Sequence, residues 1–220
     1  MSKYSKGYMG DQIGKLGTAV GYRWKGRSVM RSYQKYVSNP RTPKQMIVRS
    51  RFKRLITLNR AFHWGSKVGL SAAASAMGIT EGNLFVHLNW PNVTAVSPDD
   101  VTVNYSSLKL SLGDLPEATF GAVNFGSGSH LHIEAPLTGG ADQFGADEND
   151  DVYLFAYCPE LNQGAIGSAA KRTAEKVSVN VPASWDGMEV YVYGFAVGGK
   201  EGLNLGLTSR TAYCGSGEVV

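Results

Sequence analysis

The chain has 220 residues, long enough for one or two domains that each bury a core, so its stability requires neither disulfide bonds nor a metal ion. Glycine is frequent, with 27 residues, which favours a loop-rich β protein over a helical one. No apolar stretch follows the lysines near the amino terminus, and no window is apolar enough to cross a bilayer, so we expect neither a secretory signal nor membrane contact. We therefore expect a cytoplasmic product whose cysteines, Cys158 and Cys214, are reduced.

The net charge of +4 conceals a division along the chain. Residues 1–60 contain 15 Lys and Arg against a single acid, Asp11, whereas residues 61–220 contain 7 Lys and Arg against 17 Asp and Glu. Surfaces of opposite sign steer and hold a polyanion, or hold each other between subunits. The division predicts that residues 1–65 form a basic arm made for contact.

Residues 18–33 predict a β-hairpin. Two β-prone runs flank Lys25-Gly26-Arg27, and a glycine-containing connection between such runs is typical of a hairpin. Along each run the side chains alternate in character, so we expect one face to pack while the other carries arginine.

Residues 43–64 predict a helix. Thr42 is a suitable N-cap, Pro43 suits the first turn, and Gln45 completes a capping-box pattern. Within this helix an apolar stripe recurs at steps of four, three and seven residues, formed by Val48, Phe52, Leu55 and Phe62. The helix is expected to end near Gly65.

Residues 66–106 are interpreted as a connector with short helices at 71–77 and about 81–89, followed by the first strand. From Val101 onward the pattern has a period of two. Strands are expected at 101–112, 119–125, 129–135, 151–158, 175–181, 188–197 and 207–214. About seven short strands separated by turn residues are typical of an immunoglobulin or fibronectin type III sandwich. The sequence thus predicts a mainly β protein, with an immunoglobulin-like β-sandwich at 107–220 preceded by a hairpin and helix arm.

Two clusters have the composition of a metal site without its full pattern. His130, His132 and Glu134 share one face of a predicted strand, where two imidazoles and a carboxylate can bind zinc, but an exposed strand face has the same alternation. An acidic loop lacks the ligand spacing of an EF-hand, and we interpret it as an acidic contact patch. Its residues are Asp142, Asp147, Glu148, Asp150 and Asp151.

Motifs of catalysis are missing from the sequence. It has neither a Gly-x-Ser-x-Gly elbow nor a Gly-Lys-Ser/Thr phosphate loop, and the cysteines have no nearby histidine. We therefore predict a non-enzymatic protein with no catalytic residues, metal or cofactor.

The arm interleaves aromatic and basic residues, a mixture that binds nucleic acid through phosphate contacts and stacking. Alternatively, the aromatics form the core of the arm and the cations pair with acids on a neighbouring subunit, because the same chain already supplies an acidic surface. The cations predicted to bind a partner are Arg23, Arg27, Arg31, Arg41, Arg49, Arg51, Lys53, Arg54 and Arg60.

The sequence resembles an uncharacterised family, a domain of unknown function, found in Bacteroidetes and in their phages and prophages. The resemblance spans about residues 10–215, and its most specific piece is Asn39-Pro40-Arg41-Thr42-Pro43-x-Gln45. Other matching pieces are Gly14-Lys15-Leu16-Gly17, Trp24-Lys25-Gly26, Val29-Met30-Arg31-Ser32, Arg49-x-Arg51-Phe52, Gly113-Asp114-Leu115-Pro116, Val152-Tyr153-Leu154 and Trp185-x-Gly187. The resemblance implies a basic hairpin and helix joined to an immunoglobulin-like domain, with no established activity.

Taken together, these patterns predict a structural component of a phage or prophage particle, such as a capsid, connector or tail accessory protein. Its arm docks on other protein subunits within a homo- or hetero-oligomeric assembly, and its location is the virion or the bacterial cytoplasm. One alternative is a nucleic-acid-binding protein that uses residues 20–60. Another is an adhesin or carbohydrate-binding sandwich that uses aromatics such as Trp185 or Tyr213.

Overall fold

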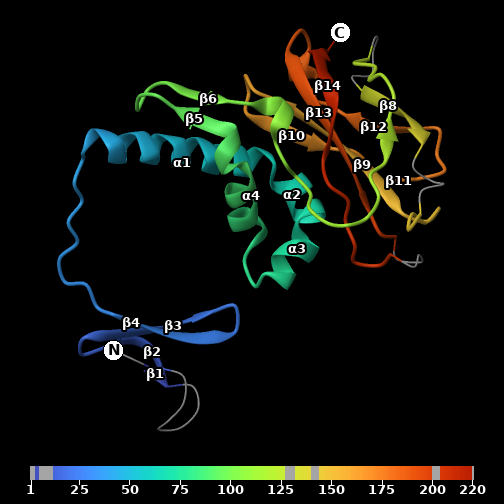
Figure 1. Cartoon of the computed structure of the whole chain (residues 1–220). Helices are drawn as coiled ribbons and strands as arrows, with labels where there is room; N and C mark the ends of the chain where they lie inside the picture. The colour runs from blue at the N-terminus through green and yellow to red at the C-terminus, as the bar shows by residue number, and fades with distance from the viewer. Residues whose placement is uncertain (1–2, 5–11, 127–131, 140–143, 200–203, 220) are drawn as a thin grey trace. The chain divides into compact units, whose positions relative to one another are not determined.

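The computed structural model describes residues 3–4, 12–126, 132–139, 144–199 and 204–219 (Figure 1). With 37% of residues in strands and 26% in helices, the protein is mainly β, as predicted, and its antiparallel sheets are open. The chain divides into two compact units, residues 1–42 and residues 43–220. The predicted arm of residues 1–65 therefore spans the division, with its hairpin in the first unit and its helix in the second.

The first unit is a single antiparallel sheet in the order β1-β2-β3-β4. Its strands are β1 (Lys3–Tyr4), β2 (Gln12–Leu16), β3 (Ala19–Trp24) and β4 (Arg27–Ser32). The two-residue turn between β3 and β4 has positive φ at Lys25 (46°) and Gly26 (77°), and such turns match the twist of hairpin strands. Gly21 is required by a close approach, because a Cβ there would lie 2.1 Å from the carbonyl oxygen of Gln12.

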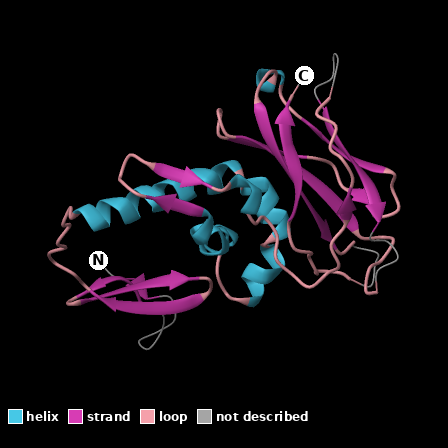
Figure 2. Cartoon of the chain, turned by 45° about the horizontal axis from the view of Figure 1, so that its top comes forward, coloured by secondary structure: helices cyan, strands magenta, loops and turns pink. Residues whose placement is uncertain are grey.

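The second unit begins with helices that lie beside a large sheet (Figure 2). They are α1 (Pro43–Ala61), α2 (His63–Gly69), α3 (Ser71–Ala76) and α4 (Glu81–Asn89). Short 3-10 helices follow at η1 (Trp90–Asn92), η2 (Tyr105–Ser107) and η3 (Ala183–Trp185). The predicted helices at 43–64, 71–77 and 81–89 thus have counterparts. The helix α2 is additional, because the first predicted helix ended at residue 64 and α2 extends to Gly69.

Three sheets make up the rest of the second unit. A five-stranded sheet contains β9 (Asp151–Cys158), β10 (Gln163–Ile166), β11 (Ala170–Lys171), β13 (Glu189–Val197) and β14 (Ala212–Glu218). A three-stranded sheet contains β7 (Thr119–Phe120), β8 (His132–Gly139) and β12 (Lys176–Asn180). A separate pair is formed by β5 (Val93–Ala95) and β6 (Val101–Val103).

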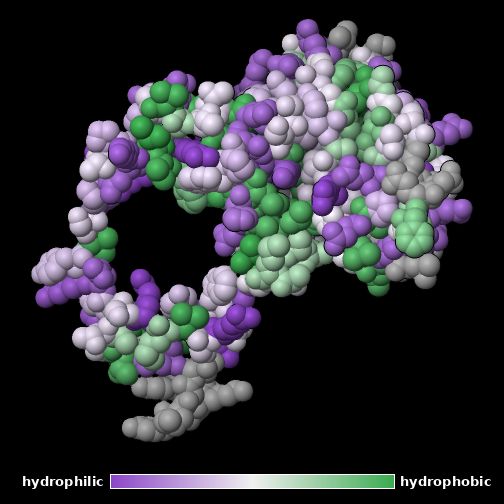
Figure 3. Space-filling view, viewed as in Figure 1, coloured by the Kyte–Doolittle hydropathy of each residue, from purple (hydrophilic) through white to green (hydrophobic). Residues whose placement is uncertain are grey.

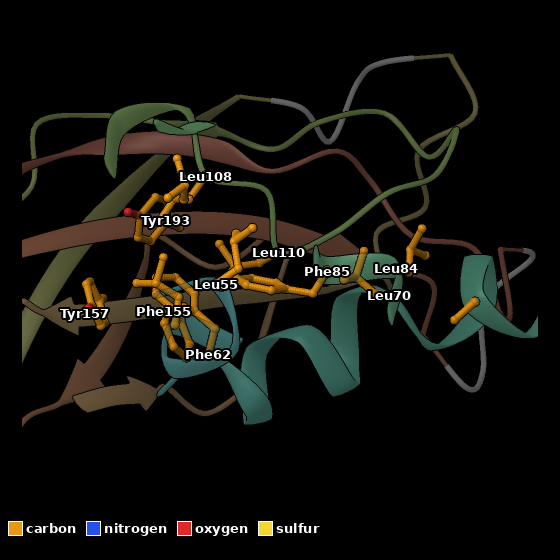
Figure 4. Packing of buried hydrophobic residues seen from close by; sticks show 13 residues of the cluster. Leu55, Phe62, Leu70, Leu84, Phe85, Leu108, Leu110, Phe155, Tyr157 and Tyr193 are labelled. Carbon is orange, nitrogen blue, oxygen red and sulfur yellow. The ribbon is translucent and has the colours of Figure 1, made fainter. Parts of the chain in front are cut away.

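The central strands β9 and β13 are buried on both faces. Leu154 and Ala156 of β9 face a cluster shared with β8, β12 and β13, which the two larger sheets enclose between them. Phe155 and Tyr157, the alternate residues, face the helices. Phe62, at the end of α1, lies 5.0 Å from the Phe155 ring and 4.6 Å from the Tyr157 ring, centroid to centroid (Figure 4). The second unit is therefore layered as helices, sheet and sheet.

The predicted strand at 101–112 is largely wrong. Only 101–103 is a strand, although Leu108 and Leu110 alternate into the core as strand residues do. The backbone between them pairs with a side chain instead: Asn89 donates to the Lys109 carbonyl (2.9 Å) and accepts from its N–H (2.8 Å). Alternation reports which side chains are buried, but it does not report what the backbone bonds to.

The other predicted strands differ less. At 119–125 only β7 is a strand, and the predicted strand at 207–214 starts later, as β14. Residues 129–131 of another lie outside the described residues, and β8 continues it to Gly139. The strand β10 was not predicted, since its sequence, Gln-Gly-Ala-Ile, lacks a β-branched alternating pattern.

Candidate docking surface

The strand register assigns the side chains of the first unit to two faces of its sheet. Val20 pairs with both Lys15 and Arg31, and Trp24 pairs with Arg27, so these cations share a face with the aromatic residues. We call this the aromatic face, formed by Lys15, Val20, Tyr22, Trp24, Arg27, Val29 and Arg31. The other, which we call the Met30 face, is formed by Leu16, Ala19, Gly21, Arg23, Ser28, Met30 and Ser32. The expectation that arginine would avoid the packing face is wrong for Arg27 and Arg31.

Among its described residues, the first unit has no apolar core. Only Gly21 is buried, while the large side chains remain in water: Met30 is 61% exposed and Leu16 is 49% exposed. In the segment that follows the sheet, residues 33–42, Tyr36 is 78% exposed, and Arg41 is exposed as well. Hydrophobic and hydrophilic residues alternate over the visible surface of this unit (Figure 3). A sheet must bury a face against another element, and chains of about 40 residues rarely do so alone.

The cations of α1 fall into two groups. Arg49, Lys53 and Arg60 are exposed. In contrast, Arg51 stacks its guanidinium 4.3 Å from the Trp90 ring centroid and donates to the Trp90 carbonyl, and Arg54 donates to the Tyr105 hydroxyl (2.9 Å). Arg51 and Arg54 were both predicted to bind a partner, but the structure uses them to fasten α1 to its own unit.

The apolar stripe predicted on α1 is divided in the same way. Leu55 and Phe62 are fully buried, whereas Val48 is 52% exposed and Phe52 is 49% exposed. Phe52 instead lines an open groove of about 380 Å³ between α1 and α4, together with Ile56, Asn83, Val86, His87 and Trp90. The stripe is longer than the part of α1 that the core covers, so Val48 and Phe52 remain at the surface.

The predicted acidic patch is not a single surface. Asp150 is fully buried, where its carboxylate pairs with Arg172 at 3.0 Å and accepts from the side-chain amide of Asn204. Asp151 is partly buried and pairs with Lys171 at 2.8 Å. Asp142 lies outside the described residues. Asp147 is partly exposed and Glu148 is exposed, so within the described part of the loop these two are the acids best presented to a partner.

The possible metal site has a different arrangement in the structure. His130 lies outside the described residues. The Glu134 carboxylate is held by Lys176, whose Nζ is 2.8 Å and 2.9 Å from its two oxygens, and by His132 at 3.3 Å. The hydrogen bond from Lys176 lowers the pKa of Glu134 below its ordinary value. Glu134 thus acts as the acceptor in an ion pair, and the described parts of the chain contain no group of three or more metal-ligating side chains.

Comparison with known protein families assigns the chain. A family model matches residues 10–208, almost the whole chain. The chain belongs to DUF6266, a family of unknown function. The match includes β2, β3 and β4 of the first unit and nearly all of the second. Neither a curated protein nor a solved structure matches the chain. Among the described residues of this DUF6266 chain, none of the helices has the length and apolarity needed to cross a membrane.

The remaining candidate residues of this DUF6266 chain are mostly internal. Trp185 is fully buried and its indole donates to Gln163 (3.3 Å), whereas Tyr213 is 39% exposed. Both cysteines are free thiols. Cys158 is buried, and burial raises the pKa of Cys214 to about 12, which keeps its thiol protonated.

Proposed function

We propose that the protein is a non-enzymatic structural component of a phage or prophage particle, a capsid, connector or tail accessory protein, located in the virion or in the bacterial cytoplasm before assembly. In this proposal the first unit and the exposed cations of α1 dock on the acidic part of a neighbouring copy. The two larger sheets of the second unit then form the immunoglobulin-like body that projects from the particle. The family resemblance suggests the phage setting, and the physical argument concerns the docking.

The observation that carries the proposal is the first unit's lack of a core. Its Met30 face exposes Leu16 and Met30, and among the residues of this unit that the structure describes, no buried cluster compensates for the entropy of ordering the sheet. A partner surface that covers the Met30 face supplies the missing burial. Small domains without disulfides or metals commonly gain stability in this way, by association.

Charge complementarity favours a second copy of the chain as the partner. Residues 12–60 contain no acidic residue, and residues 61–220 carry ten more acids than Lys and Arg. Opposite surfaces on one chain make a head-to-tail contact between copies, which extends into a ring or a filament. The exposed cations Arg49, Lys53 and Arg60, together with Arg41 in the segment after the sheet, supply the positive side of that contact.

Sedimentation velocity of the full chain tests this proposal. We expect assemblies larger than a monomer that grow with protein concentration and dissociate as salt rises from about 50 mM to about 500 mM, because salt screens exposed charges. The triple variant R49E/K53E/R60E and the double variant L16D/M30D should each reduce assembly. The matched control K67E/K109E/R210E makes the same change of charge on other exposed residues and should assemble normally. A chain that stays monomeric at all concentrations, or a control that loses assembly equally, would overturn the proposal.

A further inference from the structure

The aromatic face of the first unit has a composition that protein docking does not require. Tyr22 is 40% exposed and Trp24 is 39% exposed, and both point from β3 to the side of the sheet that also carries Arg27 and Arg31. Tyr33, one residue beyond β4, is 44% exposed. These three partly exposed rings lie on or next to one face of the sheet, and the Lys15 ammonium lies over one side of the Tyr33 ring.

Cations share this face with the rings, and one of them is in contact with a ring. Lys15 of β2 places its Nζ 3.8 Å from the centroid of the Tyr33 ring. Arg27 is directly opposite Trp24 in the register, and such opposite residues have Cβ atoms about 4.5–5.5 Å apart. Arg31 is opposite Val20, one step further along the face. Lys15 therefore lies over the Tyr33 ring, Arg27 is the cross-strand partner of Trp24, and Tyr22 is opposite Val29, which lies between Arg27 and Arg31 on the same face.

The surrounding charge is predominantly of one sign. Residues 1–60 contain 15 Lys and Arg and a single acid, Asp11, which lies outside the described residues. A positive field of this kind attracts a polyanion and raises its local concentration. A single-stranded nucleic acid matches both features of this face, because its phosphates pair with the cations and its bases stack on the rings.

We propose that the aromatic face binds single-stranded nucleic acid, with bases stacked on Tyr22, Trp24 and Tyr33 and phosphates contacted by Lys15, Arg27 and Arg31. Bases stack on aromatic side chains with little dependence on sequence, because every base has a π face. Sheet faces that carry aromatic residues commonly stack two or three bases in this way.

A single strand fits this face better than a duplex. In a duplex the bases are already stacked on one another, and their faces are closed to a flat aromatic surface. A duplex would therefore contact the cations alone and leave the rings in water. The preference for a single strand is what separates this site from a general basic surface.

This inference goes beyond the docking proposal and does not depend on it. Docking uses the Met30 face and the cations of α1 and of residues 33–42, whereas nucleic acid uses the opposite face of the same sheet. The full chain can engage both partners, because successive side chains of a strand point to opposite sides.

Fluorescence anisotropy with labelled oligomers tests the site in the full chain, at protein concentrations below those at which it assembles. The probes are thymidine and uridine oligomers of about ten nucleotides and a duplex of mixed sequence. We expect the single strands to bind more tightly than the duplex. Each of Y22A, W24A and Y33A should weaken binding by roughly 5- to 150-fold, the effect of losing one stacked base.

A charge variant and a control separate stacking from simple attraction. K15Q/R27Q/R31Q should reduce the magnitude of the salt slope by about 2, since each phosphate neutralised on a single strand contributes about 0.7. L16A/M30A changes the other face of the sheet and should leave nucleic-acid binding within about twofold of the unmodified chain. Because the alanine variants can also loosen the sheet, Y22F/W24F/Y33F keeps all three rings and should retain binding.

The outcomes are decisive in both directions. Loss of binding in the alanine variants with retention in the phenylalanine variant supports the stacked complex. A lack of binding to either oligomer would overturn the proposal. So would a duplex bound as tightly as the single strands, alanine variants that bind like the unmodified chain, or a phenylalanine variant that fails with the sheet intact.

Discussion

The two units of this chain use the same residue types in opposite ways. In the second unit, Tyr157 and Tyr193 are fully buried and their hydroxyls donate to Asn162 (2.9 Å) and to the Tyr105 carbonyl (2.7 Å). Burial raises the pKa of both hydroxyls well above the ordinary value of a tyrosine. In the first unit, Tyr22 and Trp24 remain about 40% exposed. These two tyrosines of the second unit are thus core residues, whereas the two aromatic residues of β3 lie at the surface.

Arginine shows the same contrast. Arg172 is buried in the second unit and neutralised by Asp150, whereas Arg27 and Arg31 of the first unit are exposed within an acid-free stretch of sequence. Buried charges are tolerated only when they are paired. The difference teaches that the second unit neutralises its buried charge internally, whereas the first unit leaves these two arginines at its surface.

Among the substitutions that test this comparison, Phe62→Ala should cause the largest loss of stability. Phe62 contacts the rings of Phe85, Phe155, Tyr157 and Tyr193, so its removal leaves a cavity at the centre of the layer between the helices and the sheet. We expect the free energy of unfolding of the second unit to fall by about 3–5 kcal/mol. Urea denaturation followed by far-UV circular dichroism measures it.

Tyr22→Ala is the matched change in the first unit. Its ring is 40% exposed, so the free energy of opening β3 and β4, measured by amide hydrogen exchange, should fall by less than about 0.5 kcal/mol. Equal losses from the two substitutions would mean that Tyr22 supports a core, and the comparison between the units would fail.

Arg172→Met tests whether the buried ion pair belongs to the stable unit. The substitution keeps the length of the side chain but leaves the Asp150 carboxylate buried without its charge partner. We expect a loss of about 3 kcal/mol in the free energy of unfolding. Adding Asp150→Asn should recover part of that loss, since no buried charge is then left unpaired. An Arg172→Met variant as stable as the parent would show that the loop relaxes and exposes Asp150 to water.

Gly21→Val should affect the first unit alone. A Cβ at this position would lie 2.1 Å from the Gln12 carbonyl oxygen, so β2 cannot keep its approach to β3. Amide hydrogen exchange should lose protection in β2 and β3, while the urea midpoint of the second unit stays unchanged. Thr18→Val, in the exposed turn of the same sheet, serves as the control. A shifted midpoint would mean that the two units unfold together.

Much of the second unit could be predicted from the sequence because its signals are local. The pair Thr42 and Pro43 marks the start of α1, and the alternation in 151–158 and 188–197 predicts β9 and β13 closely. The strand predicted around Lys109 was wrong because the backbone there hydrogen-bonds to the distant Asn89 side chain, and no local sequence pattern indicates such a partner. Periodicity identified the buried side chains of β9, of β13 and of the segment around Lys109. It identified the backbone hydrogen bonding only of β9 and β13.

The candidate site was harder to predict than the fold. Charge identified the basic arm, yet it did not separate the fastened Arg51 and Arg54 from the exposed Arg49, Lys53 and Arg60, because that depends on where Trp90 and Tyr105 lie. In the first unit, the face on which each side chain lies likewise depends on the strand register, which the sequence alone does not specify. The observed strand pairing brings Arg27 and Arg31 to the aromatic face, and a one-residue shift of the register would have placed them on the Met30 face.

The smallest expected effect concerns pH and the second unit. Lys176 holds the pKa of Glu134 below its ordinary value of 4.5. A lowered pKa in the folded state stabilises the protein at pH values above the unfolded pKa, and this contribution is lost as the pH falls through the folded pKa. Lys176→Met should therefore reduce the urea midpoint slightly near pH 7, and the difference from the parent should shrink as the pH is lowered from about 4.5 to about 3. Lys109→Met, which removes an exposed lysine outside the sheets, should give a difference that does not depend on pH in this range. If the Lys176→Met difference were instead constant down to pH 3, the ion pair would not set the Glu134 pKa, and the exposed face of β8 would resemble the aromatic face of the first unit in having its charges available to a partner.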